Sequence, residues 1–472
     1  MELVSNDEKP LNILILAAGL GTRMKSDRAK VLHWLNGRPL IAHVCETALL
    51  LSPEKVFVVV GHQADEVEDA VLNEFDAGRF EFVLQLKQLG TGDAVNAARK
   101  FLADQDSTIM VLSGDVPMIR ESTLRRLNET HKNENAPCTV LTVELNDPFG
   151  YGRVIRDSKD GFERIVEQKD ATDEEKKIAE INSGIYCFDG RKLFDALAKV
   201  QNNNAQGEYY LTDVPRILKD SGETVSIFLH GDAKEVEGVN DRGQLAAMER
   251  MKIDETIEKL MKESGVTFID PRNAYISAKA VVGRDTVICP NVTIEGETVV
   301  GSNCVVRSGT RLSNAKIGDN VEIRDNCLII DSEVGDNCTV GPMAHLRGNA
   351  VMAEGSKVGN FVELKKTKLG KGSKSSHLTY LGDATIGENT NIGAGVVTCN
   401  YDGKNKHETH IGDNVKIGSD TMLIAPVTVG DGAVTGAGSV VTKDVENGEL
   451  VVGVPARGIR SASTRSVSDN ED

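Results

Sequence analysis

An aliphatic residue followed directly by glycine recurs through the second half of the chain, and four mostly polar or small residues follow each pair. Many copies lie six residues apart, or seventeen to eighteen, which is three phrases. This pattern is typical of a parallel β-helix, in which three short strands make each coil of a triangular prism and aliphatic residues fill the interior. We therefore predict a left-handed parallel β-helix of hexapeptide repeats over residues 265–460. The pairs are Val282-Gly283, Val300-Gly301, Ile317-Gly318, Val334-Gly335, Val340-Gly341, Val358-Gly359, Ile386-Gly387, Ile392-Gly393, Ile411-Gly412, Ile417-Gly418 and Val429-Gly430.

The first half of the chain instead alternates continuous apolar runs with stretches of helical periodicity. The runs cover residues 13–16, 56–60, 82–84 and 109–112. Continuous apolar strands separated by helices indicate a mostly parallel sheet with both faces covered, so we predict an α/β, Rossmann-like domain over residues 1–240. Ligands of such sheets bind at the carboxyl ends of the strands.

Between the two halves, residues 241–264 are predicted to form a connecting helix. Their apolar residues are spaced for one side of a helix, and charged residues fill most other positions. The polar residues 461–472 lack periodicity and are expected to form a disordered tail. The apolar positions of the helix are Leu245, Met248, Ile253, Ile257, Leu260 and Met261.

Charge, cysteine content and the lengths of the apolar runs exclude several classes of partner, metal site and location. A net charge of −17 argues against nucleic acid, because phosphate backbones are bound by basic surfaces. Eight cysteines without a Cys-x-x-Cys pair imply core packing in a reducing compartment and no zinc site. The apolar run 11–20 follows an acidic segment and ends in a glycine turn, so we interpret it as a buried strand of a cytoplasmic protein and not as a signal peptide. No run is long enough to cross a membrane, and no membrane insertion is expected.

A glycine-rich turn, Gly19-Leu20-Gly21-Thr22-Arg23-Met24, follows the first predicted strand. Glycines at a strand-to-helix turn let backbone N–H groups approach a phosphate, and a helix start favours negative charge. The methionine excludes the dinucleotide-binding fingerprint, and no Gly-Lys-Ser/Thr completes a Walker loop. Taken alone, a glycine turn without a ligand explains the motif equally well. Arg23 and Lys30, two cations able to neutralise a polyphosphate, favour the phosphate interpretation.

Asp115 stands at the end of another buried strand, in the sequence Ser113-Gly114-Asp115-Val116-Pro117. A carboxylate there is well placed to hold a divalent metal ion, since Mg²⁺ bound together with phosphates typically uses one or two protein oxygens. A helix-capping aspartate is the alternative, and a second oxygen ligand would decide between them.

Several motifs, in order along nearly the whole chain, resemble those of the sugar-1-phosphate nucleotidylyltransferases. Together with the β-helix, the chain is similar to the bacterial family of bifunctional N-acetylglucosamine-1-phosphate uridylyltransferases and glucosamine-1-phosphate N-acetyltransferases. The motifs are Leu16-Ala17-Ala18-Gly19-Leu20-Gly21-Thr22-Arg23-Met24, Lys30-Val31-Leu32-His33, Gln88-Leu89-Gly90-Thr91-Gly92, Gly114-Asp115-Val116-Pro117, Gly150-Tyr151-Gly152-Arg153, Glu167-Gln168-Lys169-Asp170-Ala171, Asn182-Ser183-Gly184-Ile185, Gln206-Gly207-Glu208-Tyr209-Tyr210-Leu211-Thr212-Asp213 and Glu237-Gly238-Val239-Asn240.

This resemblance implies two consecutive reactions that make UDP-N-acetylglucosamine for cell-wall and envelope polymers. Acetyl transfer from acetyl-coenzyme A to glucosamine-1-phosphate comes first. Uridylyl transfer from UTP to N-acetylglucosamine-1-phosphate, with release of pyrophosphate, comes second. The sugar phosphate oxygen can attack the α-phosphorus of UTP in line without a covalent intermediate, so the protein need only position the substrates and neutralise charge.

The resemblance also implies roles for residues of the first domain. It places Mg²⁺ on Asp115 and Asn240, and sets Arg23 and Lys30 against the phosphates as catalytic cations. Gln85, Gly90 and Thr91 are implied to bind uracil, and Gly152, Glu167 and Asn182 to bind N-acetylglucosamine. The full set of implied substrate-binding residues is Leu16, Ala17, Ala18, Gly19, Lys30, Gln85, Gly90, Thr91, Gly152, Glu167, Asn182 and Asn240.

In the β-helix, the segment from Gly372 to Asp383 breaks the six-residue count and is expected to project a functional loop. His377 within it would by default be an ordinary surface histidine. Acetyl transfer to an amine, however, requires loss of a proton from the attacking ammonium, and histidine is the usual base. Residues expected on nearby coils and able to bind a phosphate are Arg347, Lys365, Lys366 and Tyr380.

For this second site the resemblance implies that His377 is the catalytic base. It places the sugar phosphate on Arg347, Lys365, Tyr380 and Asn391. It places acetyl-coenzyme A along Ala394, Asn400, Tyr401, Ser419 and Ala437, with an amide such as that of Asn400 able to stabilise the oxyanion.

Four residues depart from the family pattern. Ser113 stands where some members carry tyrosine, and Ala29 precedes Lys30 where proline is usual. Gly348 replaces a proline, and Gly453 falls where some members have an arginine near coenzyme A, a cation that Arg457 or Arg460 could supply.

The faces of a prism offer few clefts, so the acetyltransferase site is expected between neighbouring prisms of a homotrimer. One alternative is a single-activity sugar-1-phosphate nucleotidylyltransferase with a structural or regulatory β-helix. The sequence around His377 argues against this alternative. The other is a regulatory assembly protein, of the translation-factor kind, that has lost its active site. Retention of Lys30, Asp115 and Asn240 speaks against the latter.

Overall fold

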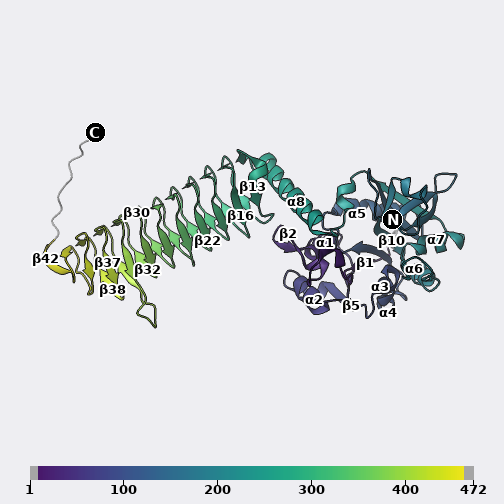
Figure 1. Cartoon of the computed structure of the whole chain (residues 1–472), viewed down its shortest axis with the longest axis horizontal. Helices are drawn as coiled ribbons and strands as arrows, with labels where there is room; N and C mark the ends of the chain where they lie inside the picture. The colour runs from purple at the N-terminus through teal and green to yellow at the C-terminus, as the bar shows by residue number, and fades with distance from the viewer. Residues whose placement is uncertain (1–8, 462–472) are drawn as a thin grey trace, which may run out of the picture. The chain divides into compact units, whose positions relative to one another are not determined.

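The computed structural model describes residues 9–461, and the chain separates into two compact units, Met1–Arg250 and Met251–Asp472 (Figure 1). The predicted tail lies, from residue 462 onward, outside the described residues. Over 9–461, every helix is too short or too polar to cross a membrane.

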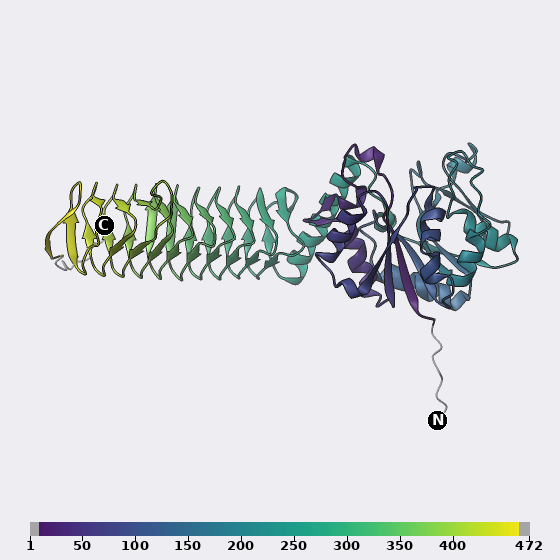
Figure 2. The same cartoon turned by 90° about the horizontal axis from the view of Figure 1, so that it is seen from below.

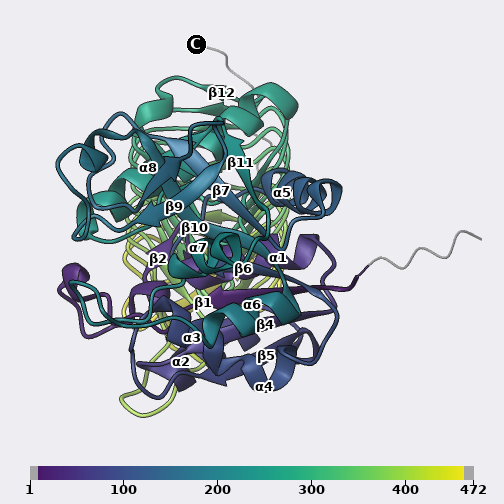
Figure 3. The same ribbon diagram turned by 90° about the vertical axis from the view of Figure 1, so that its right-hand side faces the viewer.

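A central sheet organises the first unit, and its strands follow one another across the view of Figure 3. Their order is β11 (Val225–His230), β7 (Cys138–Glu144), β10 (Glu180–Asp189), β6 (Thr108–Ser113), β1 (Leu11–Leu16), β4 (Lys55–Val60) and β5 (Phe80–Leu84). Neighbouring strands are parallel except β10, which runs antiparallel to β6 and β7. The hairpin of β8 (Arg153–Arg156) and β9 (Phe162–Val166) joins the sheet through β10. The predicted mostly parallel sheet is confirmed.

Alternate residues of each strand enter two separate cores, one on each face of the sheet. Ile13 and Ile15 of β1 pack in the first core, against α1 (Leu40–Leu50), α2 (Ala64–Leu72) and α5 (Glu121–Glu134). Leu14 packs in the second core, against α3 (Thr91–Ala97), α4 (Arg99–Leu102), α6 (Gly190–Leu197) and α7 (Asp213–Asp220). Helices therefore cover both faces, which leaves the strand ends as the open edge of the sheet.

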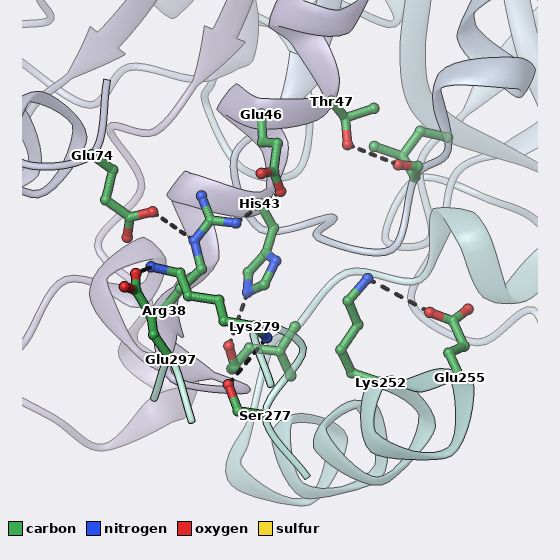
Figure 4. Close-up of polar contacts among 12 residues, drawn as sticks. Arg38, His43, Glu46, Thr47, Glu74, Lys252, Glu255, Ser277, Lys279 and Glu297 are labelled. Atoms are coloured by element: carbon green, nitrogen blue, oxygen red, sulfur yellow. Dashed lines mark hydrogen bonds and ion pairs between the residues drawn. The ribbon is translucent and has the colours of Figure 1, made fainter. Parts of the chain in front are cut away.

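Ion pairs of Arg38 hold the connection between β1 and α1 in place. After β1, the chain forms two single 3₁₀ turns, η1 (Thr22–Met24) and η2 (Lys30–Leu32), and the hairpin of β2 (Trp34–Leu35) and β3 (Arg38–Pro39). Arg38 lies between two carboxylates, 2.7 Å from Glu46 of α1 and 2.6 Å from Glu74 (Figure 4). These ion pairs anchor the hairpin that follows Lys30.

The second unit is a left-handed parallel β-helix, whose stacked coils are seen side-on in Figure 2. From β12 (Thr267–Phe268) to β42 (Arg457–Ser461), the described residues form three sheets of 12, 10 and 9 strands, one for each face of the prism. Partners in successive coils are mostly 17 or 18 residues apart, as in the pairings of Val282 with Val300 and of Val300 with Ile317. The aliphatic residues of the eleven predicted pairs are all buried in one core. The predicted fold is confirmed.

The glycine of each pair is required by the close stacking of the coils. A Cβ atom on Gly301 would lie 2.5 Å from the carbonyl oxygen of Gly318, so a side chain there would force the coils apart. At the start of the prism, α8 (Arg242–Glu263) packs Ile253, Ile257 and Leu260 into the prism core. Met261, which we predicted on the same apolar side, is 39% exposed. It follows Leu260 by one residue, about 100° further around the helix axis, and points to solvent.

Candidate active sites

Two adjoining cavities open at the carboxyl ends of β1 and β6 in the first unit. The larger has a volume of about 510 Å³ and the smaller about 380 Å³. Both cavities are lined by Leu16 and Thr91, and also by Ser113 and Asp115 at and after the end of β6. These residues therefore stand where groups bound in the two cavities would meet.

The larger cavity gathers eight of the twelve residues that we expected to bind substrates in this unit, including the three implied to bind uracil. They are Leu16, Ala17, Ala18, Gly19, Lys30, Gln85, Gly90 and Thr91. Gln85 Nε2 donates to Asp93 Oδ2 at 2.8 Å, which fixes the amide at the cavity wall. Gly90 has a φ of 115°, and a Cβ there would lie 2.6 Å from the carbonyl oxygen of Tyr209. Glycine is thus needed for the segment around Tyr209 to close against this wall.

The glycine-rich turn differs from our expectation in one respect. We predicted a strand-to-helix turn, in which a helix start would favour a phosphate. The structure has only the single 3₁₀ turn η1 after Gly21. One such turn aligns too few peptide dipoles to supply that field. The favourable charge at this wall comes instead from side chains, and mainly from Lys30.

The smaller cavity gathers the residues that we expected to bind the sugar. Gly152, Glu167 and Asn182 line it together with Arg23 and Asn240. Glu167 accepts a hydrogen bond from Thr212 Oγ1 at 3.1 Å, and burial raises the pKa of its carboxyl despite this bond. A Cβ on Gly152 would lie 3.4 Å from Glu167 Oε1, so glycine leaves that carboxyl accessible. Asn182 Nδ2 donates to the Tyr186 hydroxyl at 2.7 Å.

Oxygens of Asp115 and Asn240 converge on one cation in the structure. Lys30 Nζ donates to Asp115 Oδ2 in a short ion pair and to Asn240 Oδ1 at 3.3 Å. Arg23 donates to the same Asn240 oxygen at 2.7 Å. Two oxygens that already share an ammonium group fit a divalent cation bound with substrate phosphates, which needs few protein ligands. Among the described residues, no cluster of three or more His, Cys, Asp and Glu forms a metal cage.

Two of the four departures from the family pattern, Ala29 and Ser113, lie in this unit. Ala29 has a φ of −53°, an angle that proline also adopts, and its N–H donates to Gln63 Oε1 at 2.5 Å. Proline lacks that N–H, so alanine gains a hydrogen bond that helps fix the turn before Lys30. Ser113 lines both cavities.

In the second unit, the predicted loop between Gly372 and Asp383 is wrong. That segment forms β30 (Lys374–His377) and β31 (Tyr380–Gly382), which pair in register with the coils on either side. The six-residue pattern fails there because Ser375 occupies the interior position held by Val358 and Ile392 in the neighbouring coils.

The loop that does project lies further along the chain, between β34 (Val397–Cys399) and β35 (Thr409–Ile411), where Tyr401 bridges Lys406. It is visible in the yellow-green part of Figure 1. Its coil needs 25 residues to bring His410 beside Thr385, whereas most coils need 17 or 18.

His377 is exposed on the prism surface and is oriented by one partner. Its Nδ1 lies 2.5 Å from Oδ1 of Asn360, the residue directly beside it on β27 (Lys357–Asn360). An amide oxygen can only accept a hydrogen bond, so Nδ1 carries the proton of the neutral ring and Nε2 keeps its lone pair. That tautomer is the one a general base needs. Sequence reasoning missed Asn360, which lies 17 residues before His377.

A second polar group is built around Asp383. Its Oδ2 accepts from Lys365 Nζ at 2.7 Å and from Asn400 Nδ2 at 2.5 Å, and all three side chains are mostly buried. Burial opposes the ammonium form of Lys365, but the hydrogen bond to Asp383 and its negative charge outweigh burial and raise the lysine's pKa. Lys406, on the projecting loop, interacts with Lys365, whose proximity lowers the pKa of Lys406. Sequence reasoning missed both Asp383 and Lys406.

The remaining predicted sugar-phosphate residues lie on neighbouring coils. Arg347 of β25 (His345–Arg347) stands beside Lys365 of β28 (Glu363–Lys365) and donates to Glu363 at 2.7 Å. Tyr380 is half-buried and stands beside Glu363. Asn391 is exposed at the start of β33 (Asn391–Ile392).

Most of the residues predicted to contact acetyl-coenzyme A form a column with His377. Strand register places Ala394 beside His377 in the next coil. Asp420 N then donates to Ala394 O at 2.7 Å, and Gly438 N donates to Ser419 O at 2.8 Å, so Ser419 and Ala437 follow at the same corner. Asn400 lies with Asp383 instead, and Tyr401 is 60% exposed on the projecting loop.

Gly348 and Gly453, the two departures from the family pattern in this unit, have φ of 64° and 98°. This region of backbone angles favours glycine over the proline or arginine expected there.

Known proteins similar to this chain identify its family. The nucleotidyl transferase family matches residues 12–252, the GMPPB C-terminal domain family matches 265–370, and the bacterial transferase hexapeptide family matches 408–443. The chain is 47% identical over 442 residues to the bifunctional protein GlmU of Syntrophomonas wolfei, with 94% of this chain and 97% of that one covered. It is 48% identical to GlmU of Shouchella clausii over 93% of this chain and 95% of that one. It is 47% identical to GlmU of Listeria monocytogenes serotype 4b over 93% and 94%. The chain therefore belongs to the GlmU family of bifunctional enzymes, which combine a uridylyltransferase with an acetyltransferase.

Proposed function

We propose that the larger cavity of the first unit binds UTP and the smaller one binds N-acetylglucosamine-1-phosphate. The observation that carries this assignment is the wall that the cavities share, because Asp115 lines both. A phosphate oxygen of the sugar in one cavity would then face the α-phosphorus of the nucleotide in the other. Gln85 and Thr91 would bind uracil, and Glu167 and Asn182 would bind the sugar.

Asp115 and Asn240 are proposed to hold Mg²⁺, which would neutralise phosphate charge during the transfer. Lys30 now occupies the position between these two oxygens. With substrates bound, Lys30 and Arg23 would donate to phosphate oxygens instead. The protein thus aligns the two substrates and balances their charge, and no residue needs to act as a nucleophile.

In the second unit, His377 is proposed to take the proton from the amine of glucosamine-1-phosphate as the amine attacks the thioester carbonyl. Asn360 leaves Nε2 free to accept that proton. The C–S bond of acetyl-coenzyme A then breaks, and the thiolate leaves with a proton returned from the imidazolium. Lys365, Arg347 and Lys406 supply positive charge for the sugar phosphate, and the column of Ala394, Ser419 and Ala437 provides a surface for coenzyme A.

We propose that the prism works as a homotrimer, because a row of apolar side chains flanks His377. Met343, Phe361 and Leu378 occupy one corner in three successive coils and are 47%, 54% and 62% exposed. Their φ angles of 53°, 55° and 48° are unfavourable for large side chains. The same corner carries Asn326 before the row and Gly395 after it, residues that tolerate this conformation. Exposed, strained apolar residues beside a catalytic residue favour an interface with another copy.

Residues 1–240 would therefore carry out uridylyl transfer and residues 265–460 acetyl transfer, with residues 241–264 as a linker. The direct test is incubation with acetyl-coenzyme A, glucosamine-1-phosphate, UTP and Mg²⁺, with free thiol and pyrophosphate followed separately. We expect thiol first and pyrophosphate after it. Pyrophosphate release that does not depend on acetyl-coenzyme A would contradict the proposed order.

A further inference from the structure

The two proposed metal ligands sit on different loops. Asp115 follows β6 and is joined to α5 by residues 116–120. Asn240 follows β11 and the 3₁₀ turn η5 (Ala233–Val236). The loops touch near the site, where Val239 N donates to Asp115 O at 2.9 Å. The distance between the two oxygen ligands therefore depends on how firmly these loops are held together.

Glu235, in η5, joins the same two loops at a second point. Its carboxylate is buried, with 4% of the residue exposed. Oε2 accepts from Arg120 N at 3.2 Å and from Thr123 Oγ1 at 2.7 Å, and Oε1 accepts from Arg120 Nη1 at 3.2 Å. His230 Nε2 lies 3.4 Å from Oε1. One side chain thus ties the start of α5 to η5.

A buried carboxylate is costly unless its oxygens are hydrogen-bonded, so Glu235 holds its donors in a narrow range of positions. Its donors begin five residues after Asp115, and Glu235 itself is five residues before Asn240. The loop that carries Asp115 is held at one more point, since Thr47 Oγ1 of α1, labelled in Figure 4, donates to Ile119 O at 3.2 Å. Glu235 does not line either cavity, so it does not meet a substrate itself.

We infer that Glu235 is a positioning residue for the metal site: its carboxylate sets the separation of Asp115 and Asn240. This inference rests on the proposed roles of those two residues. Residues that orient metal ligands without touching the metal typically change metal affinity by about 10- to 100-fold when they are altered. Loss of the Glu235 charge should therefore weaken metal binding more than it slows the reaction at saturating metal.

The test uses the full chain and the substitution Glu235→Gln. Mn²⁺ binding is titrated by electron paramagnetic resonance with UDP-N-acetylglucosamine present, and the Mg²⁺ dependence of pyrophosphate release is measured separately. We expect about tenfold weaker Mn²⁺ binding. The KM for Mg²⁺ should rise to a similar extent, with a smaller change in kcat and unchanged acetyl transfer. Thr123→Val, which removes one donor to Glu235 and keeps the side-chain shape, should shift both quantities in the same direction and keeps the test available if Glu235→Gln does not fold.

The matched control is Glu180→Gln. Glu180 is likewise buried, lines neither cavity, and accepts from a threonine, Thr142, at 2.7 Å and from an arginine, Arg156, at 2.6 Å. Its bonds join the strands β10, β7 and β8, however, and not the loops that carry Asp115 and Asn240. Its Mn²⁺ affinity should equal that of the wild type. Asp115→Ala is measured alongside. Weaker binding in Asp115→Ala with wild-type binding in Glu235→Gln and Thr123→Val would overturn the inference alone. Unchanged binding in Asp115→Ala would refute the proposed metal ligands instead.

Discussion

At the scale of single residues, the pair of Asn360 and His377 shows what a sequence can and cannot reveal. A histidine among basic residues indicated acid–base chemistry, but nothing marked Asn360 as its partner. The two side chains meet only because the prism brings residues 17 positions apart onto adjacent strands. The same is true of Asp383, which orients both Lys365 and Asn400.

Substitution of Asn360 tests this pairing. Asn360→Leu removes the acceptor for Nδ1–H, so the ring is free to take the wrong tautomer, and we expect acetyl transfer to fall about tenfold or more. Asn360→Asp keeps the acceptor and adds a negative charge, which favours the protonated ring. The acid limb of its pH–rate profile should move to higher pH. Identical profiles for wild type and Asn360→Asp would show that Asn360 does not act on His377.

His131 provides a test of acid stability in the first unit. It is buried, with Nδ1 3.0 Å from Thr139 Oγ1, and burial lowers its pKa to about 4. Between pH 6.5 and about 4, the unfolded chain therefore binds a proton there that the folded chain does not, and stability falls as the pH drops through this window. The loss should reach about 3 kcal/mol.

The measurement is urea unfolding at pH 7 and pH 4.5, followed by fluorescence of Trp34, the single tryptophan of the chain. His131→Gln should lose less stability than the wild type between the two pH values. His410→Gln, at an exposed histidine, is the control and should behave as the wild type does. Equal pH dependence in His131→Gln and wild type would refute the assignment.

At the scale of elements, the prism explains why the six-residue repeat predicted the coils correctly and why its interruption at residues 372–383 wrongly predicted a loop. Aliphatic–glycine pairs predicted the coils because each must fill the interior and allow the next coil to approach. The count failed at Ser375, where a polar residue takes an interior position without any change in coil length. The real insertion, between β34 and β35, lengthens the spacing of the pairs to 25 residues, from Ile386 to Ile411, and we did not interpret that longer spacing as a loop.

An apolar residue should accordingly be tolerated at Ser375 without loss of stability. Its hydroxyl is buried and, among the described residues, finds no hydrogen-bond partner. Ser375→Ala is expected to stabilise the prism by about 1 kcal/mol, because an unsatisfied buried hydroxyl is removed. Ser373→Ala is the control: its hydroxyl donates to Gly387 O at 2.6 Å and accepts from Thr390 N at 2.8 Å, and its loss should destabilise by about 1 kcal/mol. Thermal unfolding followed by circular dichroism measures both, and destabilisation by Ser375→Ala would show that its hydroxyl is bonded in solution.

At the scale of the whole molecule, hydrophobic periodicity was enough to predict two fold classes. The two activities came from the resemblance of the motifs, in order along the chain, to a known family. The homotrimer was expected from the flat faces of the prism, but the surface that it would use was not predicted. Met343, Phe361 and Leu378 are unremarkable in sequence. Strand register places them at one corner, and their backbone angles and exposure distinguish them there.

The double substitution Phe361→Asn with Leu378→Asn tests the proposed trimer. Asparagine tolerates positive φ, so the coils should fold at least as well as in the wild type. Loss of the apolar row should dissociate the assembly in sedimentation experiments and abolish most acetyl transfer, with uridylyl transfer retained. Asn291→Asp, at the same corner several coils earlier, should leave the assembly intact. A dissociated double variant with full acetyl transfer would show that one prism holds a complete site.

The two active sites are proposed to work independently of each other, and a comparison of Asp115→Ala with His377→Ala in the full-length protein tests this. Thiol release from acetyl-coenzyme A and pyrophosphate release from UTP are followed for each, with glucosamine-1-phosphate and N-acetylglucosamine-1-phosphate supplied separately. Asp115→Ala should lose pyrophosphate release and keep thiol release. His377→Ala should lose acetyl transfer by about 10²- to 10⁴-fold and keep pyrophosphate release. Loss of both activities in either variant, or near-normal acetyl transfer by His377→Ala, would contradict the account.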